Sequence, residues 1–200
     1  MERKSFLKRF KGHFSTITRH KVEVTKLCFR CGLIKQGLLH DLSKYSPIEF
    51  WAGVKYFQGY RSPIDAEKED LGYSAGWLHH KGRNRHHWEY WVDKSFDRTH
   101  FVVQPMPLNY LLEAACDKVA ASKIYNKEHY YDGSAYDFLM RGRDRYFMQE
   151  VNFKRHIHLL EYLKDNGEEK ALAYYKDLYN KWKKDPKYNI DITSVKEDYE

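Results

Sequence analysis

"PLNYLLEAACDKVAASKIYN", at residues 107–126, is the stretch that decides the fold. At 100° per residue, one face of this predicted helix carries leucine, alanine and valine, and the other carries tyrosine, alanine and isoleucine. A helix that is apolar on two sides is typically central in a fold. Asp117 lies on one of these faces, and a buried carboxylate is costly without a partner. The stretch therefore predicts a central helix that carries a charge in need of a partner.

Helical periodicity also dominates the chain on both sides of this stretch. We expect helices at about 15–31 (closed by Gly32), 33–44, 46–58, 65–81, 144–165 and 168–184. Ser46, Pro47 and Glu49 have the pattern of an N-cap, a first turn and a capping box. The only strand candidate, "FVVQPMP" at 101–107, contains two prolines, so 92–106 is expected to be irregular. These patterns predict an all-α protein.

Composition bounds the class of protein. The 200-residue chain suits one domain at 1–200 with a proper core, and its 16% aromatic content is unlike that of disordered chains. A net charge of +7 favours anionic partners such as phosphates, nucleotides or nucleic acid, although the basic residues are spread along the chain. Three cysteines do not make a disulfide framework. No secretory signal or membrane-length apolar run is present, so we expect a cytoplasmic protein with no membrane partner.

Histidines and carboxylates recur at positions where a solvated role is unexpected. His20 lies within the apolar stripe of the helix at 15–31, and His40 and Asp41 adjoin on the next predicted helix. Two histidine pairs bracket a short loop: His79, His80, His86 and His87. Imidazoles and carboxylates are the usual ligands of Zn, Mn and Fe, and a divalent cation would partner a buried carboxylate. This set indicates a metal site.

Each member of the set also has a plainer explanation. His20 alone is more often a hydrogen-bonded core histidine, and Asp117 alone is more often paired with a buried Arg or Tyr. The histidine pairs could form a solvated loop. Cys28 and Cys31 share the stripe of His20 and are expected to pack in the core, because a structural zinc site needs four ligands. Only the joint occurrence of the histidines and carboxylates, in this order, favours a metal site.

The order His20, then His40 with Asp41, then Asp117 resembles the HD-domain superfamily, which is named for a His, a His-Asp pair and a late Asp on helices of one bundle. "HDLSK" at 40–44 is similar to the His-Asp-x-x-Lys form of HD phosphodiesterases, and the histidine pairs are similar to the additional histidines of two-metal members. "HHKGRNRHHWE" at 79–89 also resembles an HHxxxNxHHxE block of an uncharacterised branch. The resemblance implies an HD-type helical bundle, with its core at about 15–126 and a helical C-terminal extension at about 127–185.

The resemblance further implies a cofactor of one or two divalent transition-metal ions: Mn, Fe, Zn or Ni. The implied ligands of one ion are His20, His40, Asp41 and Asp117. Asp41 would bridge to a second ion held by one histidine of each pair, with His80 and His86 favoured over His79 and His87. A metal-activated water would then attack phosphorus.

Further residues receive roles from the same resemblance. Lys44, one helical turn from Asp41, would reach a phosphate oxygen, and Arg83 and Arg85 would clamp an anionic substrate. Solvated loop charge is the alternative for both arginines. Asp41, Lys44 and Glu89 are the predicted catalytic residues. Glu89 or Glu113 could orient a histidine or act as an acid, whereas a surface position is the default for both.

The sequence therefore predicts a metal-dependent phosphohydrolase acting on a nucleotide or other small phosphoester. Cyclic dinucleotides are not expected, because the glycine- and proline-containing signature of two-metal phosphodiesterases is replaced by "KGRNRHHWEYW" at 81–91. One alternative is an HD-type di-iron oxygenase. Another is a non-enzymatic basic module that binds nucleic acid, with "YYKDLYNKWKK" at 174–184 stacking on bases. Helix packing or a homo-oligomer interface is the preferred explanation of that last stretch.

Overall fold

The computed structural model describes residues 5–192, and this part of the chain is predominantly helical. It contains nine α-helices: α1 (Phe6–Arg30), α2 (Ile34–Leu39), α3 (Pro47–Tyr56), α4 (Pro63–Leu71), α5 (Ala75–Lys81), α6 (Leu108–Asn126), α7 (Ser134–Arg141), α8 (Glu150–Asn166) and α9 (Glu168–Lys184). Single 3₁₀ turns are η1 (Leu42–Tyr45), η2 (Trp88–Trp91), η3 (Lys127–His129) and η4 (Arg143–Arg145). The predicted all-α class is confirmed.

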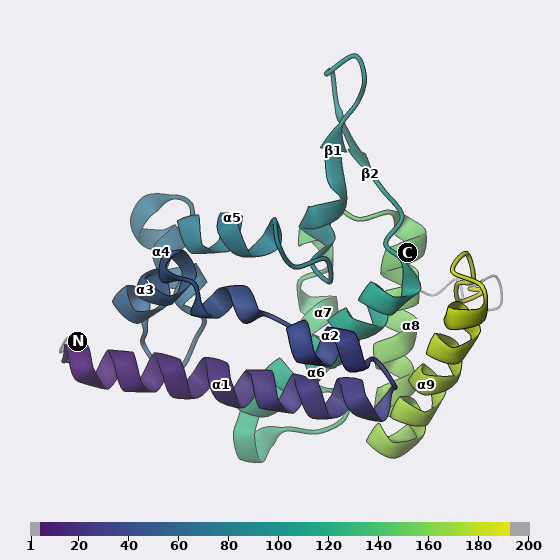
Figure 1. The fold of residues 1–200 in the computed structure, drawn as a ribbon, viewed down its shortest axis with the longest axis horizontal. Helices are drawn as coiled ribbons and strands as arrows, with labels where there is room; N and C mark the ends of the chain where they lie inside the picture. The colour runs from purple at the N-terminus through teal and green to yellow at the C-terminus, as the bar shows by residue number, and fades with distance from the viewer. Residues whose placement is uncertain (1–4, 193–200) are drawn as a thin grey trace.

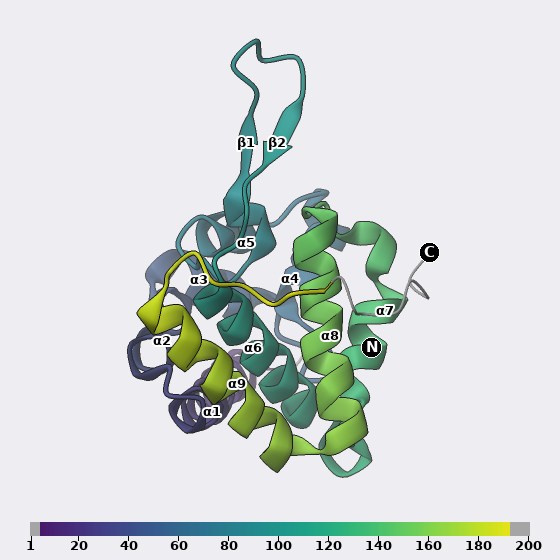
Figure 2. The same cartoon turned by 90° about the vertical axis from the view of Figure 1, so that its right-hand side faces the viewer.

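Helix α6 is the centre of the molecule, as its apolar pattern predicts. It packs against α1, α2, α7, α8 and α9, and Figures 1 and 2 show it enclosed by these helices. Leu108, Leu111 and Leu112 are completely buried along it. Burying a leucine side chain contributes about 1.5–3 kcal/mol, so this helix supplies a large part of the apolar driving force.

The C-terminal helices complete the same core. Gly167 adopts a positive φ of 80° between α8 and α9, which lets the chain reverse there. Leu160 of α8 and Leu172 of α9 join the apolar cluster formed by α1 and α6, and the hydroxyl of Tyr175 donates to the carbonyl of Leu159. The expectation for 168–184 matches α9, but α8 begins at Glu150 rather than 144, and α7 was not predicted.

Two of the predicted N-terminal helices are not continuous in the structure. The predicted helix at 33–44 ends at Leu39, because Asp41 adopts a left-handed backbone (φ 53°) before the turn η1. The predicted helix at 65–81 is two helices, because Gly72 (φ 78°) ends α4 and the Ser74 side chain caps α5. The first predicted helix also starts earlier, at Phe6. The break at 41 lets both α2 and α3 pack on α1, and the break at 72 lets both α4 and α5 pack on α3.

The prediction that 92–106 is irregular is also wrong. Strands β1 (Val92–Lys94) and β2 (Phe101–Val103) form an antiparallel pair with Val92 opposite Val103. The prolines do not prevent this pairing, because Pro105 and Pro107 follow the strand. Figures 1 and 2 show the hairpin projecting from the helical body. Within residues 5–192, every helix is too short or too polar to cross a membrane.

Candidate metal centre

Three helical segments bring the predicted first ligand group together. His20 comes from α1, His40 and Asp41 follow α2, and Asp117 comes from α6. One ligand atom from each of these four residues lies within 4.8 Å of the others. Nε2 of His20 is 2.9 Å from Oδ1 of Asp117, and Nε2 of His40 is 3.3 Å from Oδ2 of Asp41. This group could hold a metal ion.

The backbone at Asp41 is unusual in a way that serves this group. A positive φ at a residue other than glycine is uncommon and costs of order 1–2 kcal/mol, although aspartate tolerates it better than most residues. The turn separates Asp41 from the preceding helix and leaves its carboxylate almost completely buried. The stability of the surrounding fold therefore holds Asp41 in a conformation that it would not favour alone.

A second group shares Asp41 and uses the histidine loop. Its members are Asp41, His80, His86 and His87, whose ligand atoms also lie within 4.8 Å of one another. Oδ1 of Asp41 is 3.2 Å from Nε2 of His80 and 3.4 Å from Nε2 of His86. Oδ2 of the same carboxylate faces His40 at 3.3 Å and His20 at 3.9 Å. Each oxygen of Asp41 therefore faces a different set of histidines.

Two buried glutamates orient the imidazoles. Oε1 of Glu113 lies 2.9 Å from Nδ1 of His40 and 3.1 Å from Nδ1 of His86, which leaves Nε2 of both rings directed at the cluster. Oε2 of Glu49 lies 2.7 Å from Nδ1 of His80. Carboxylates in this position fix the tautomer of a metal-binding histidine and raise its basicity.

The surface position expected by default for Glu113 and the capping role expected for Glu49 are wrong, whereas the alternative for Glu113, a contact to the histidines, is what the structure has. Glu113 is buried rather than on the surface, and Glu49 contacts His79 and His80 instead of closing a capping box with Ser46. The position of Glu113 could have been anticipated, because it lies one helical turn before Asp117 on a helix that is apolar on two sides. Glu49 carried no such signal, since its partners lie 30 residues away.

Several buried atoms of the cluster lack a hydrogen-bond partner. Among the described residues, Nε2 of His40, Nε2 of His86 and Oδ1 of Asp41 make no well-directed hydrogen bond. Buried polar atoms are nearly always satisfied, and each exception calls for a physical explanation. All three atoms face the cluster, and one kind of partner, a divalent cation, would satisfy them together. The residues present therefore fit a metal ion.

The electrostatics of the cluster favour the ligand forms of its two aspartates and of His20. Burial raises the pKa of Asp41, but the charges of His40 and Lys44 outweigh it and hold that pKa well below its usual range. Burial also opposes ionisation of Asp117, and the facing imidazoles of His20 and His40 reverse the effect on its pKa. Burial lowers the pKa of His20, which keeps that imidazole neutral. Metal ions require deprotonated ligands, so these three forms suit one, whereas Asp41 raises the pKa of His40 well above its usual value despite burial, and a bound cation would have to displace that proton.

Lys44 and Glu89 lie beside the cluster. Nζ of Lys44 is 2.6 Å from Oδ2 of Asp41, and that carboxylate raises the pKa of the lysine despite burial. Oε2 of Glu89 is buried without a hydrogen-bond partner among the described residues, and burial raises the pKa of this carboxyl.

Three predicted residues lie outside the ligand groups. Nδ1 of His79 is 2.5 Å from Glu49, and within the described chain no ligand group includes this histidine. Arg83 and Arg85 are exposed, and the guanidinium of Arg85 lies over the rings of Tyr90 and Tyr110. The sequence did not predict these aromatic contacts of Arg85.

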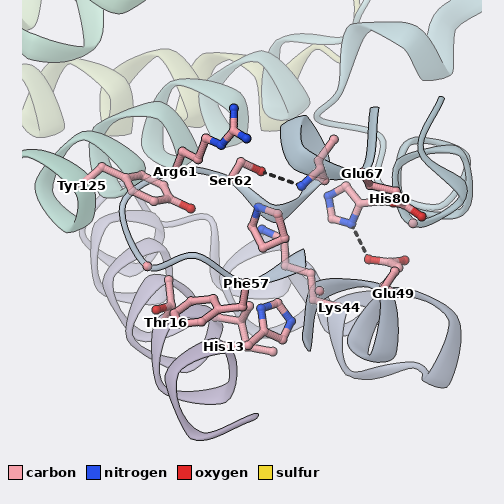
Figure 3. A pocket seen from close by; sticks show the side chains of 17 residues that line it. His13, Thr16, Lys44, Glu49, Phe57, Arg61, Ser62, Glu67, His80 and Tyr125 are labelled. Carbon is pink, nitrogen blue, oxygen red and sulfur yellow. Dashed lines mark hydrogen bonds and ion pairs between the residues drawn. The ribbon is translucent and has the colours of Figure 1, made fainter. Parts of the chain in front are cut away.

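Residues of the cluster line two pockets. The first, shown in Figure 3, contains Lys44, His80 and Tyr125 and is called the Lys44 pocket. The second contains His86, His87 and Asp117 together with Lys118, and it is called the Lys118 cleft. Ser62 and Ile64 line both, so the two openings adjoin. His156, which was not among the predicted site residues, also lines the Lys118 cleft.

The fold and the cluster together define an all-α protein whose buried histidines and carboxylates could hold a metal ion. Residues 9–160 match the model of DUF5662, a family of unknown function, and because this match covers more than half of the chain, the chain belongs to that family. No curated protein and no solved structure matches it.

Proposed function

We propose that this protein is a metal-dependent phosphohydrolase of HD type that acts on a nucleotide or other small phosphoester. The observation that carries the proposal is the carboxylate of Asp41, whose two oxygens face two different histidine groups. The order His20, His40–Asp41, Asp117 along the chain, which resembles the HD superfamily, supports the same assignment.

His20, His40, Asp41 and Asp117 would hold one ion. Asp41 and the histidines at 80, 86 and 87 supply the donors for a second. This mixture of imidazole nitrogen and carboxylate oxygen suits Mn, Fe, Zn or Ni. A bound ion would lower the pKa of a coordinated water and polarise a phosphoryl oxygen.

The protein side chains have separable roles in this proposal. Glu113 and Glu49 hold the imidazoles with Nε2 directed inward. Lys44 places a positive charge beside Asp41, where it would bind an oxygen of the reacting phosphate. Glu89, whose buried Oε2 has no hydrogen-bond partner among the described residues, would hold the proton for the leaving oxygen.

An activity screen tests the proposal. Protein loaded with Mn²⁺, Fe²⁺, Zn²⁺ or Ni²⁺ is offered nucleotides and general phosphoesters in anaerobic buffer, and we expect phosphate release. His86→Gln removes a donor of the second group and should reduce the rate at least about a hundredfold, in line with the loss of a ligand that sets metal affinity. His100→Gln, at an exposed histidine of the β1–β2 hairpin, is the matched control and should keep the wild-type rate.

Two outcomes would contradict the proposal. Oxygen consumption by the iron-loaded protein, without phosphate release from any phosphoester, would indicate the di-iron oxygenase instead. Nucleic-acid binding that survives His86→Gln, again without hydrolysis, would indicate the binding module.

A further inference from the structure

The Lys118 cleft carries positive charge that the protein does not neutralise. Its basic side chains come from four elements: Lys68 of α4, Lys118 of α6, Arg141 of α7 and Arg145 of η4. Within residues 5–192 none of these four makes an ion pair with a carboxylate. The carboxylates that line the cleft are Asp65, Glu89 and Asp117. Asp117 is engaged with His20 at 2.9 Å, and none of the three carboxylates forms an ion pair with a basic group of the cleft among the described residues, so the basic groups remain available to a ligand.

The Lys44 pocket differs in this respect. Lys44 pairs with Asp41 at 2.6 Å, and the guanidinium of Arg61 makes two hydrogen bonds to Glu69 at 2.6 and 2.5 Å. Arg61 therefore already has a carboxylate partner, and Lys44 is held beside Asp41, where the proposed function assigns it to the reacting phosphate rather than to a further anionic group. An anionic ligand that extends away from the cluster would be attracted towards the Lys118 cleft rather than into the Lys44 pocket.

A buried histidine in the cleft also lacks a partner. His156 of α8 is 3% exposed, lines the cleft, and its Nε2 makes no hydrogen bond to any described residue. A buried nitrogen left unpaired costs about 1–3 kcal/mol, and a ligand atom in the cleft would recover this loss. His156 therefore points to an occupant independently of the basic residues.

The cleft is also rich in aromatic rings. Trp77, Trp88, Phe138 and Tyr146 line it, and Phe138 is 59% exposed. The Tyr146 hydroxyl holds Nζ of Lys118 at 2.9 Å, and this ammonium lies 5.2 Å from the centroid of the same ring. Aromatic rings beside cations, here with the Phe138 ring exposed, are the features that bind planar, anionic ligands such as nucleotides.

We propose that the Lys118 cleft binds the non-reacting part of the substrate, and that this part carries a second anionic group and a planar ring, as in a nucleoside diphosphate. The inference rests on the proposed function. Metal ions and Lys44 would neutralise the reacting phosphate, so Lys68, Lys118, Arg141 and Arg145 serve another negative group. Arg83 and Arg85, which line neither pocket, take no part.

Calorimetric titration of the metal-loaded protein tests this assignment. The ligands are the four α,β-methylene nucleoside diphosphates, which resist hydrolysis, and the four nucleoside monophosphates. We expect at least one diphosphate to bind at least about tenfold more tightly than the monophosphate with the same base, as one charge-assisted contact allows. Arg141→Gln with Arg145→Gln should abolish this preference and leave the monophosphate affinity within about twofold of wild type.

The matched control is Lys94→Gln with Arg98→Gln, which removes the same charge from exposed positions of the β1–β2 hairpin that line neither pocket. It should keep the preference for the diphosphate, and elemental analysis should give the same metal content for all three proteins. Equal binding of mono- and diphosphates by wild type, or loss of the preference in the control alone, would overturn the inference. The hydrolysis assay separates the two proposals, because phosphate release without a diphosphate preference refutes only this one, and the preference without phosphate release refutes only the proposed function.

Discussion

Glu113 shows how one residue can organise two ligand groups at once. Its Oε1 lies within 3.1 Å of Nδ1 on both His40 and His86, and these histidines belong to different groups around Asp41. A single acceptor therefore fixes the ring orientation of two donors. Loss of its charge would loosen both imidazoles without removing a member of either group around Asp41.

We predict that Glu113→Gln weakens metal binding about 10- to 100-fold, the usual effect of losing a carboxylate that orients a ligating histidine. Competition with a chromophoric chelator measures the affinity. Glu67→Gln is the control, because Glu67 is equally buried at 5% exposure but contacts Ser74 instead of a histidine. Equal affinities for the two variants would show that Glu113 does not act through the ligands.

Some residues of the site could be predicted from the sequence, and others could not. His20 and Asp117 stood out because each is polar on an apolar helix face, and the structure places them 2.9 Å apart. The contacts of Arg85 could not be predicted from the sequence, because the partners of a loop side chain depend on the tertiary structure. Here the partners are the rings of Tyr90 and Tyr110. His156 was missed because a lone histidine in an amphipathic helix gives no local indication of which cavity it borders.

At the scale of elements, α1 and α3 approach each other through glycines. A Cβ on Gly53 would lie 2.2 Å from the ring of His13, and a Cβ on Gly12 would lie 2.3 Å from the ring of Phe57. Neither ring can move freely, because His13 and Phe57 pack on each other. This close contact holds α3, and with it Glu49, against the helix that carries His20.

We predict that Gly53→Val destabilises the protein by about 1–3 kcal/mol through overpacking. The melting temperature should then fall by several degrees, at roughly 2–4 °C per kcal/mol for a chain of this size. Gly142→Val is the control, because the nearest atoms to a Cβ there are at an ordinary 3.7 Å. A Gly53→Val protein that melts with wild type would contradict the close contact.

Elements with long periodic patterns were predictable, and short ones were not. The central helix and α9 follow from 17 or more residues of consistent pattern. The strands β1 and β2 have three residues each, so their pairing depends on the hairpin rather than on a run of strand-forming residues. Helix α7, with eight residues, is short enough for its apolar face to be decided by packing against α6 and α8.

At the scale of the whole molecule, the candidate ligands tie distant segments together. They come from α1, the α2–η1 junction, α5 with its following loop, and α6. A cation bound by these ligands would favour the folded chain over the unfolded chain, which cannot assemble them.

We predict that removing metal with EDTA lowers the melting temperature by about 5–10 °C. At a free metal concentration of 100 times Kd, binding contributes about 2.7 kcal/mol, and each kcal/mol corresponds to roughly 2–4 °C. Mn²⁺ or Zn²⁺ should restore the original value, whereas Mg²⁺ should not, because imidazole donors suit transition metals. Identical melting curves with and without EDTA would refute a structural contribution from the metal.

Elemental analysis of purified wild type and Asp41→Asn tests the central claim most directly. Asparagine keeps the size of the side chain and tolerates the positive φ at this position, so the fold should survive while the shared anionic ligand is lost. Asp97→Asn, at an exposed aspartate of the hairpin, is the control. We predict one or two transition-metal ions per chain in wild type and in the control, and less than half of that in Asp41→Asn. Full metal content in Asp41→Asn, or no metal in wild type after loading, would contradict the account.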